Sequence, residues 1–220
     1  MDSSYWERRF IELGAFWMHD GNPRRPYVRL TSGLISNGYF NCGLLQSEHA
    51  HVFRSACESL LYLVRARVRE VSPCRIIGAA EGGIALVNTL AAISGQKSAY
   101  ARRAKKTDPL VFDGRFLVFF EEGERVLLAE DTVTTGKTLI ELMQATTAAN
   151  PTCRFAPFIL AICNRSGKRL IETMRVFSLI ERDMLAWKEG ENPFTPDGQE
   201  LVPPVSAGKA NWKLFTQEYA

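Results

Sequence analysis

The chain has 220 residues, of which 46% are hydrophobic and 23% charged, a composition typical of a globular domain with room for a small accessory lobe. Its formal net charge of +3, without a Lys/Arg stripe interleaved with aromatic residues, does not indicate nucleic-acid binding. The five cysteines include no C-x-x-C pair, which argues against a disulfide framework and a zinc site. The sequence shows no signal peptide and no apolar run of about 18 residues, which argues against a membrane protein. We therefore expect a cytoplasmic protein.

The N-terminal residues 1–45 have the features of a small lobe. Large side chains at helical spacing predict a helix over Tyr5–Leu13. Further on, Tyr27–Leu30 and Gly38–Asn41 have the composition of strands, and the Thr-Ser-Gly sequence between them predicts a turn. We therefore expect these two strands to pair as a hairpin.

Residues 46–184 alternate between strand and helix patterns. Helices are predicted over Ser47–Arg67, Ile84–Ser94 and Lys137–Ala149, and strands over Cys74–Ile77, Lys97–Ala101, Phe116–Phe120, Arg125–Ala129, Phe155–Cys163 and Arg175–Glu181. This order predicts an α/β fold with a mainly parallel sheet and helices on both faces. The turn sequence Glu121–Glu124 predicts that the strands on either side of it pair as a hairpin. Residues 185–220 are rich in Pro and Gly, and we expect them to pack on the N-terminal lobe or to be partly mobile.

The stretch 125–139 carries the chemistry. Two carboxylates, Glu130 and Asp131, follow a buried strand directly, and a hydroxyl-rich loop then leads into the helix that begins near Lys137. A tight loop before a helix N-terminus aims backbone N–H groups and the positive end of the helix dipole at one point, which suits a phosphate. The carboxylates suit a ligand that donates hydrogen bonds elsewhere, as the diol of a ribose 5-phosphate does. The predicted ligand-binding residues of this loop are Thr132, Val133, Thr134, Thr135, Gly136, Lys137 and Thr138, of which Thr134, Thr135 and Thr138 add hydroxyl donors for the phosphate.

The residues alone leave two other interpretations open. Gly136-Lys137-Thr138 matches the end of the Walker motif G-x-x-x-x-G-K-[ST], but the first glycine of that motif falls on Asp131. The stretch is also compatible with a strand-to-helix turn whose threonines cap the helix.

The run from Glu130 to Gly136, Glu-Asp-Thr-Val-Thr-Thr-Gly, resembles the phosphoribosyl-pyrophosphate (PRPP) motif of type I phosphoribosyltransferases. The run Leu30–Asn41 is similar to the N-terminal hairpin of the orotate enzymes in that family, where it forms part of a hood over the base. The resemblance implies a Mg²⁺-dependent transfer of ribose 5-phosphate from PRPP to a nitrogenous base. It implies that Mg²⁺ is held mainly by PRPP and water, and that the protein is a homodimer.

The same resemblance assigns further residues to the site. The glycine loop at Ala80, Glu81 and Gly82 contacts pyrophosphate in the family, and its backbone amides suit an anion. The basic run matches a flexible catalytic loop that reaches the neighbouring subunit, although a solvated basic stretch is the simpler interpretation. Its cations are Arg102, Arg103, Lys105 and Lys106, of which Arg102 and Lys106 are predicted to be catalytic together with Glu130 and Asp131.

The predicted base contacts are Arg165, Tyr39 and Phe40, with Arg165 placed to meet the carboxylate of orotate. Orotate is the expected base, giving orotidine 5′-phosphate in pyrimidine synthesis. A purine-type base is the second interpretation, because Lys137 in Thr-Gly-Lys-Thr-Leu is reminiscent of hypoxanthine enzymes. A non-catalytic PRPP or nucleotide sensor is the third, because Ile35 and Gly82 stand where many family members have cations.

Overall fold

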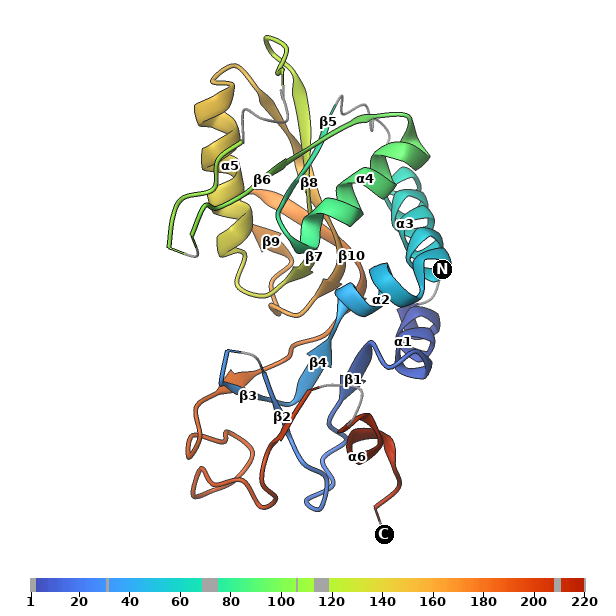
Figure 1. Ribbon diagram of the computed structural model, residues 1–220, viewed down its shortest axis with the longest axis vertical. Coiled ribbons are helices and arrows are strands. Elements are labelled where there is room, and N and C mark those ends of the chain that lie inside the picture. Colours follow the sequence, from blue (N-terminus) through green and yellow to red (C-terminus); the bar gives the residue numbers. More distant parts are fainter. Residues whose placement is uncertain are drawn as a thin grey trace. The chain divides into compact units, whose positions relative to one another are not determined.

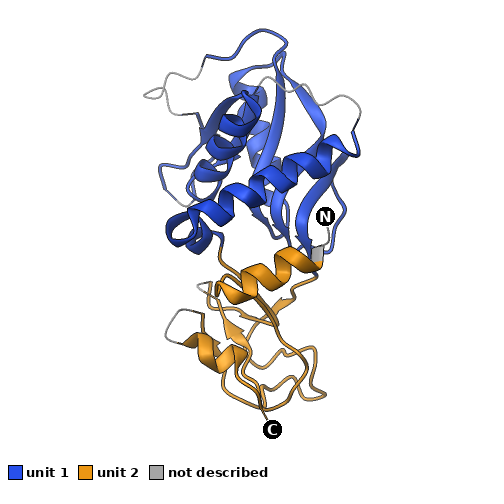
Figure 2. Cartoon of the chain, turned by 90° about the vertical axis from the view of Figure 1, so that its right-hand side faces the viewer, with its two compact units in different colours: residues 1–3, 42–182 blue, residues 4–41, 183–220 orange. Residues whose placement is uncertain are grey.

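A computed structural model describes residues 3–30, 32–68, 75–105, 107–112, 119–207 and 211–219. The chain divides into two compact units, shown in blue and orange in Figure 2. Unit 1 comprises residues 1–3 and 42–182, and unit 2 comprises residues 4–41 and 183–220. The divisions fall shortly before the boundaries at 45/46 and 184/185 that the sequence suggests.

Unit 1 is an α/β structure built on a six-stranded sheet (Figure 1). The strand order is β6-β5-β7-β8-β10-β9, and all neighbours are parallel except β9, which runs antiparallel to β10. The strands are β5 Arg75–Ala79, β6 Lys97–Ala101, β7 Arg125–Val133, β8 Arg154–Asn164, β9 Leu170–Ile171 and β10 Met174–Glu181. The helices are α2 Cys42–Glu48, α3 Ala50–Arg65, α4 Gly82–Ser94 and α5 Lys137–Ala149. The predicted parallel sheet is confirmed.

Helices cover both faces of this sheet because its central strands are apolar on both sides. Ile77, Leu128 and Ile159 pack in one buried cluster with Leu139 and Leu142 of α5. Side chains at the alternate positions, Ile76, Leu127 and Leu160, face the opposite way and meet α3 and α4 around a cavity of about 50 Å³. The continuous apolar runs of β5, β7 and β8 are therefore what a parallel sheet between two helix layers requires.

The predicted hairpin across Glu121–Glu124 is wrong. The turn itself exists, since the Glu124 N–H donates to the Glu121 carbonyl at 3.1 Å, but β7 pairs in parallel with β5 on one edge and with β8 on the other. Both edges of Val126–Leu128 are thus occupied, and Phe119 and Phe120 are not in a strand. The rest of that predicted strand lies outside the described residues.

A buried ion pair takes the place of the expected hairpin at this end of the sheet. The Arg75 Nε lies 3.2 Å from both carboxylate oxygens of Glu124, and the two side chains are 8% and 0% exposed. Arg75 also donates to the Phe119 carbonyl at 2.8 Å and lies 5.1 Å from the centre of the Phe120 ring. These contacts attach the segment before β7 to β5.

The long helix predicted over Ser47–Arg67 is two helices. α2 ends at Glu48 and α3 begins at Ala50, with His49 between them in a non-helical conformation at φ −132° and ψ 45°. The predicted start of β5 at Cys74 lies outside the described residues, and the described strand begins at Arg75.

Unit 2 combines the N-terminal residues with the C-terminal segment. Its helices are α1 Ser3–Glu12 and α6 Trp212–Thr216, and its strands are β1 Phe16–Met18, β2 Val28–Arg29, β3 Ile35–Ser36, β4 Gly38–Phe40, β11 Ala186–Trp187 and β12 Val205–Ser206. One sheet has the order β11-β3-β2-β12, and β1 pairs with β4. The Trp17 indole donates to the Phe215 carbonyl at 2.9 Å, which ties α6 to β1.

The predicted pairing of Tyr27–Leu30 with Gly38–Asn41 is also wrong. β2 pairs with β3, and β4 pairs with β1. The chain turns between β3 and β4, where the Ser36 hydroxyl accepts from the Gly38 N–H at 3.2 Å and the Asn37 carbonyl accepts from the His19 N–H at 2.8 Å. β1 is only three residues long, too short for its pairing to be evident from the sequence.

Candidate functional site

The acid pair lies at the carboxyl end of β7, within the strand rather than after it, because β7 continues to Val133. Burial and the neighbouring Asp131 raise the pKa of Glu130 to about 8, and a hydrogen bond from Thr138 opposes that shift. Glu130 Oε2 is buried and has no hydrogen-bond partner within the described structure. Burial also raises the pKa of Asp131, whose Oδ1 accepts from the Thr132 N–H at 2.9 Å. The pair thus has one buried oxygen, Glu130 Oε2, that the described structure leaves unsatisfied.

The loop after β7 leads into an uncapped helix N-terminus. Gly136 has φ +84°, and a Cβ there would lie 2.5 Å from Ile171 Cδ1, so this position requires glycine. The N-cap residue of α5 is Gly136, which has no side chain to cap the helix. The first hydrogen bond of the helix runs from the Ile140 N–H to the Gly136 carbonyl at 3.1 Å. The amides at 138 and 139 therefore have no acceptor in the helix, as an anion site at a helix N-terminus requires.

The predicted capping threonines play a small part here. The Thr135 hydroxyl accepts from the Lys137 N–H at 3.3 Å, a long contact, and Thr138 bonds to Glu130 instead of capping. Thr134 and Thr135 are exposed, and the Lys137 side chain is 80% exposed with its Nζ 3.9 Å from Glu141. Hydroxyl and amide donors thus remain open to a ligand around Gly136.

The glycine loop after β5 adjoins the acid pair. A Cβ at Gly82 would lie 2.8 Å from Asp131 Oδ2, so the carboxylate occupies the space that a side chain at position 82 would need. Gln46 of α2 donates to the Gly82 carbonyl at 3.0 Å, a contact with no signal in the sequence. The helix that follows, α4, also begins without a side-chain cap at Glu81. A second helix N-terminus therefore lies beside Asp131.

The first cation of the basic run reaches the glycine loop. The Ala80 N–H donates to the Ala101 carbonyl at 2.8 Å, and Arg102 Nη2 lies 3.4 Å from Glu81 Oε1. Arg102 also forms a two-way backbone bridge with Val111, with both N···O distances 2.9 Å, which closes the loop between them. Glu81, a carboxylate expected to oppose an anion, thus has a cation as its partner.

The other cations of the run differ in their surroundings. Arg103 donates to the Glu141 carboxylate of α5 and to the Asp108 carbonyl, so its guanidinium holds the loop against the helix. Lys105 has an exposed side chain, and its N–H donates to Asp108 Oδ2 at 2.9 Å. The predicted catalytic Lys106 lies outside the described residues.

The predicted base contacts lie in different units. In unit 1, Arg165 follows β8, and its N–H donates to the Val133 carbonyl at 2.9 Å, which places this loop beside the end of β7. Burial lowers the pKa of the Arg165 guanidinium, an environment that favours an anionic partner. In unit 2, Phe40 is buried against Phe10 at a ring distance of 5.8 Å, and Tyr39 is half-buried in β4.

A residue that the sequence does not single out organises the Arg165 loop. Asn164 is 1% exposed, and its Oδ1 accepts from both the N–H and the hydroxyl of Ser166 at 3.2 and 2.7 Å. Its Nδ2 donates to the Lys168 carbonyl at 2.7 Å. A polar residue that ends an apolar strand run is the only sequence signal for this role.

The described residues contain no group of three or more His, Cys, Asp or Glu side chains placed to hold a metal ion. Among the same residues, no helix is both long and apolar enough to cross a bilayer.

No family model matches the chain. It is similar to the orotate phosphoribosyltransferase of Pelotomaculum thermopropionicum, with 29% identity over 195 residues that cover 89% of this chain and 96% of the relative. Its fold is similar to the crystal structure of orotate phosphoribosyltransferase from Aeropyrum pernix, with a TM-score of 0.58, 20% identity and coverage of 80% and 92% of the two chains. Adenine phosphoribosyltransferase from Thermoanaerobacter pseudethanolicus matches with a TM-score of 0.52 and 17% identity over 66% of this chain and 88% of that one.

Proposed function

We propose that this chain, which by sequence and fold is a type I phosphoribosyltransferase, transfers ribose 5-phosphate from PRPP to orotate and releases pyrophosphate. The observation that carries the proposal is the acid pair at the end of β7. Glu130 Oε2 is buried without a partner, and the uncapped N-terminus of α5 follows within the same loop. A ribose phosphate satisfies both, because its diol donates to carboxylates and its phosphate accepts from amides.

The chemistry assigned to these residues is a displacement at the anomeric carbon. The bond from that carbon to pyrophosphate breaks, a bond to the base nitrogen forms, and positive charge builds on the sugar between the two events. Glu130 and Asp131 orient the diol, and Asp131 stabilises that charge. The amides and hydroxyls around Gly136 hold the 5-phosphate, which keeps the sugar in position for attack.

We assign the binding of the pyrophosphate group of PRPP to the glycine loop and Arg102. Arg102 already lies beside this loop through its contact with Glu81. Because that contact is 3.4 Å long and the Glu81 side chain is 80% exposed, it is a weak pair that an incoming diphosphate can replace. Lys106 completes this assignment on the strength of the family resemblance.

Mg²⁺ fits the chemistry of the acid pair, since it prefers carboxylate oxygens and keeps several waters. Asp131 would be its protein ligand, with PRPP and water supplying the remainder. The ion would screen the charge of the diphosphate. Mg²⁺ dependence and a homodimer are parts of the proposal that rest on the resemblance.

Orotate is favoured over a purine by the relatives similar in sequence, which include the orotate phosphoribosyltransferase of Pelotomaculum thermopropionicum at 29% identity. The fold does not make this choice, because an adenine enzyme shares it. Arg165 supports an anionic base such as orotate, whose carboxylate it can bind with two parallel hydrogen bonds.

A PRPP sensor without activity remains the alternative from another class. The two departures that motivate it have local structural explanations. Ile35 is fully buried in the core of unit 2, and Gly82 lies against the Asp131 carboxylate. Neither position has room for an extended cation in the present packing.

Asp131→Asn tests the assigned role, because it removes the charge while keeping the size of the side chain. We expect pyrophosphate release to fall by about a hundredfold or more, with the circular dichroism spectrum unchanged. Asp183→Asn is the matched control, since Asp183 is exposed and lies outside the acid pair. Equal turnover of Asp131→Asn and Asp183→Asn would contradict the proposed role.

A further inference from the structure

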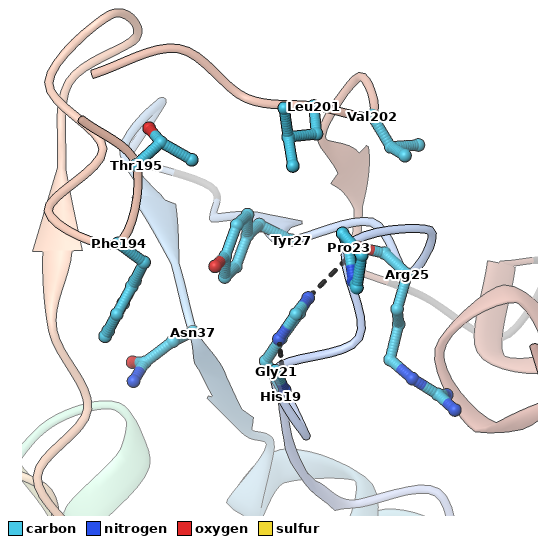
Figure 3. Close-up of a pocket in the computed structure, with 10 residues that line it drawn as sticks. All are labelled: His19, Gly21, Pro23, Arg25, Tyr27, Asn37, Phe194, Thr195, Leu201 and Val202. Carbon is cyan, nitrogen blue, oxygen red and sulfur yellow. Dashed lines mark hydrogen bonds between the residues drawn. The ribbon is translucent and has the colours of Figure 1, made fainter. Parts of the chain in front are cut away.

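Unit 2 contains a pocket of about 380 Å³ (Figure 3). It lies between the loop that follows β1 and the loop that follows β11, and all its lining residues belong to unit 2. Tyr39 and Phe40, the predicted base contacts, do not line it. Its volume falls in the range of about 300–1,000 Å³ that is common for sites of small organic ligands.

The floor of the pocket is a rigid aromatic stack. The His19 and Tyr27 rings lie 4.1 Å apart with an angle of 20° between their planes, and Trp187 packs edge-on against Tyr27 at 5.0 Å. His19 Nδ1 accepts from the Gly21 N–H at 2.9 Å, so its Nε2 carries the proton that is donated to the Arg25 carbonyl at 3.0 Å. Burial lowers the pKa of His19, which favours the neutral ring. The stack is thus uncharged and fixed in orientation.

Phe194 forms the outer wall. Its ring is nearly parallel to that of Tyr27, at 16° and 6.0 Å, and it is 51% exposed. The loop that carries it is held by the Asn192 side chain, whose Oδ1 accepts from the Phe194 N–H at 2.9 Å. Aromatic side chains in the wall and floor of a pocket favour a flat ligand over a branched aliphatic one.

The polar side chain in the pocket wall, that of Asn37, is an uncharged amide. Asn37 belongs to the pocket lining (Figure 3), and its Oδ1 is buried without a hydrogen-bond partner in the described structure. A side-chain amide presents one acceptor and two donors, the pattern that pairs with the edge of a nucleobase. A ligand that carries an N–H beside a ring acceptor would satisfy it.

The pocket does not attract anions. Arg25 belongs to its lining, but the guanidinium turns away from the cavity (Figure 3). It lies 3.1 Å from Asp20 Oδ1, donates to the Phe215 carbonyl and sits 5.0 Å from the centre of the Tyr219 ring. The Arg25 guanidinium therefore has its partners outside the pocket, at Phe215 of α6 and at Tyr219. For this reason orotate, PRPP and pyrophosphate are poor ligands for this pocket.

We propose that the unit 2 pocket binds an uncharged, planar nitrogen heterocycle of nucleobase or nucleoside size, at a site that shares no residue with the acid pair, the glycine loop or Arg165. This is a second binding site, beyond the transfer reaction. Its ligand is a different molecule from the anionic substrates of that reaction.

Isothermal titration of the full chain with uracil, adenine, uridine and adenosine tests this. We expect at least one of these four compounds to bind. Comparing the affinity of each base with that of its nucleoside shows whether the ribose contributes. Phe194→Ala and Asn37→Leu should each weaken binding by about tenfold or more. Phe119→Ala is the matched control, because Phe119 is a 74% exposed phenylalanine of unit 1, and it should leave the affinity unchanged.

A second titration separates the pocket from the transfer site. With orotate and inorganic pyrophosphate at saturation, the heterocycle should bind with unchanged affinity. Competition with orotate would overturn the proposal, as would no binding of any of the four probes, or equal affinity in wild type and Phe194→Ala. Because Phe194 is half-exposed, its truncation keeps the fold, and the readout is independent of turnover.

Discussion

The fold stabilises Glu130 in its protonated form, and the stability of unit 1 should therefore depend on pH in a defined direction. The pKa of this carboxyl is about 8 in the folded chain, against an ordinary value of 4.5. Between these two values the folded state holds a proton that the unfolded state has released. The stabilisation of the folded state by this bound proton is complete below pH 4.5 and is lost as pH rises through 8. At about 1.4 kcal/mol for each pKa unit, the total reaches about 5 kcal/mol.

Glu130→Gln removes this titration while keeping the size of the side chain and an acceptor for Thr138. The free energy of unfolding of the variant, relative to wild type, should rise by about 4 kcal/mol between pH 5 and pH 8.5. The assay is urea unfolding followed by far-ultraviolet circular dichroism. Tryptophan fluorescence is unsuitable, since the four tryptophans, at positions 6, 17, 187 and 212, all lie in unit 2.

Glu122→Gln is the control for this experiment, because Glu122 is exposed in the turn before β7. Its stability should follow that of wild type at every pH. Parallel curves for wild type and Glu130→Gln would refute the reasoning, because they would mean that Glu130 titrates alike in the folded and unfolded chains.

Two further changes test the framework around the site. Glu124→Ala leaves the guanidinium of Arg75 buried without its carboxylate, and we expect a loss of about 3–5 kcal/mol in urea unfolding; a loss below 1 kcal/mol would mean that the pair is solvated. Gly136→Ala adds a Cβ 2.5 Å from Ile171 Cδ1 at φ +84°, whereas Gly123→Ala meets only open space at φ +65°. We expect the first to cost about 1–2 kcal/mol more than the second and to weaken PRPP binding in calorimetry, and equal costs would contradict the packing argument.

Sequence reasoning located several elements of unit 1 well. The helix at Lys137–Ala149 and the strand at Lys97–Ala101 have the predicted bounds, and the parallel sheet follows from the alternation of elements. In β5, β7 and β8 the local pattern and the tertiary environment agree, because helices cover both faces of these strands.

The pairing errors have a common physical cause. A strand's partner is chosen by the space available on its edges, which the local sequence does not encode. β7 has both edges filled by β5 and β8, so the preceding segment cannot pair with it. In unit 2, β4 takes the three-residue β1 as its partner, and no local pattern distinguishes that choice from the hairpin with β2.

For the site, the sequence identified the acid pair and the helix N-terminus, but not how the loops meet. The closeness of Gly82 to Asp131 and of Arg102 to Glu81 arises from the registers of β5 with β7 and of β5 with β6. Neighbouring parallel strands bring their carboxyl ends to one edge of the sheet, where ligands bind in open α/β folds. The distances between those loops are tertiary facts that no motif contains.

Pyrophosphate release from PRPP and Mg²⁺ is the most direct test, with orotate, uracil, hypoxanthine, guanine and adenine offered separately. We predict release with orotate alone, and release at background level from Asp131→Asn in the same assay. Release with a purine and not with orotate would contradict the assigned base. No release with any of the five, from a chain that is folded and binds PRPP, would contradict the transferase itself and favour a sensor.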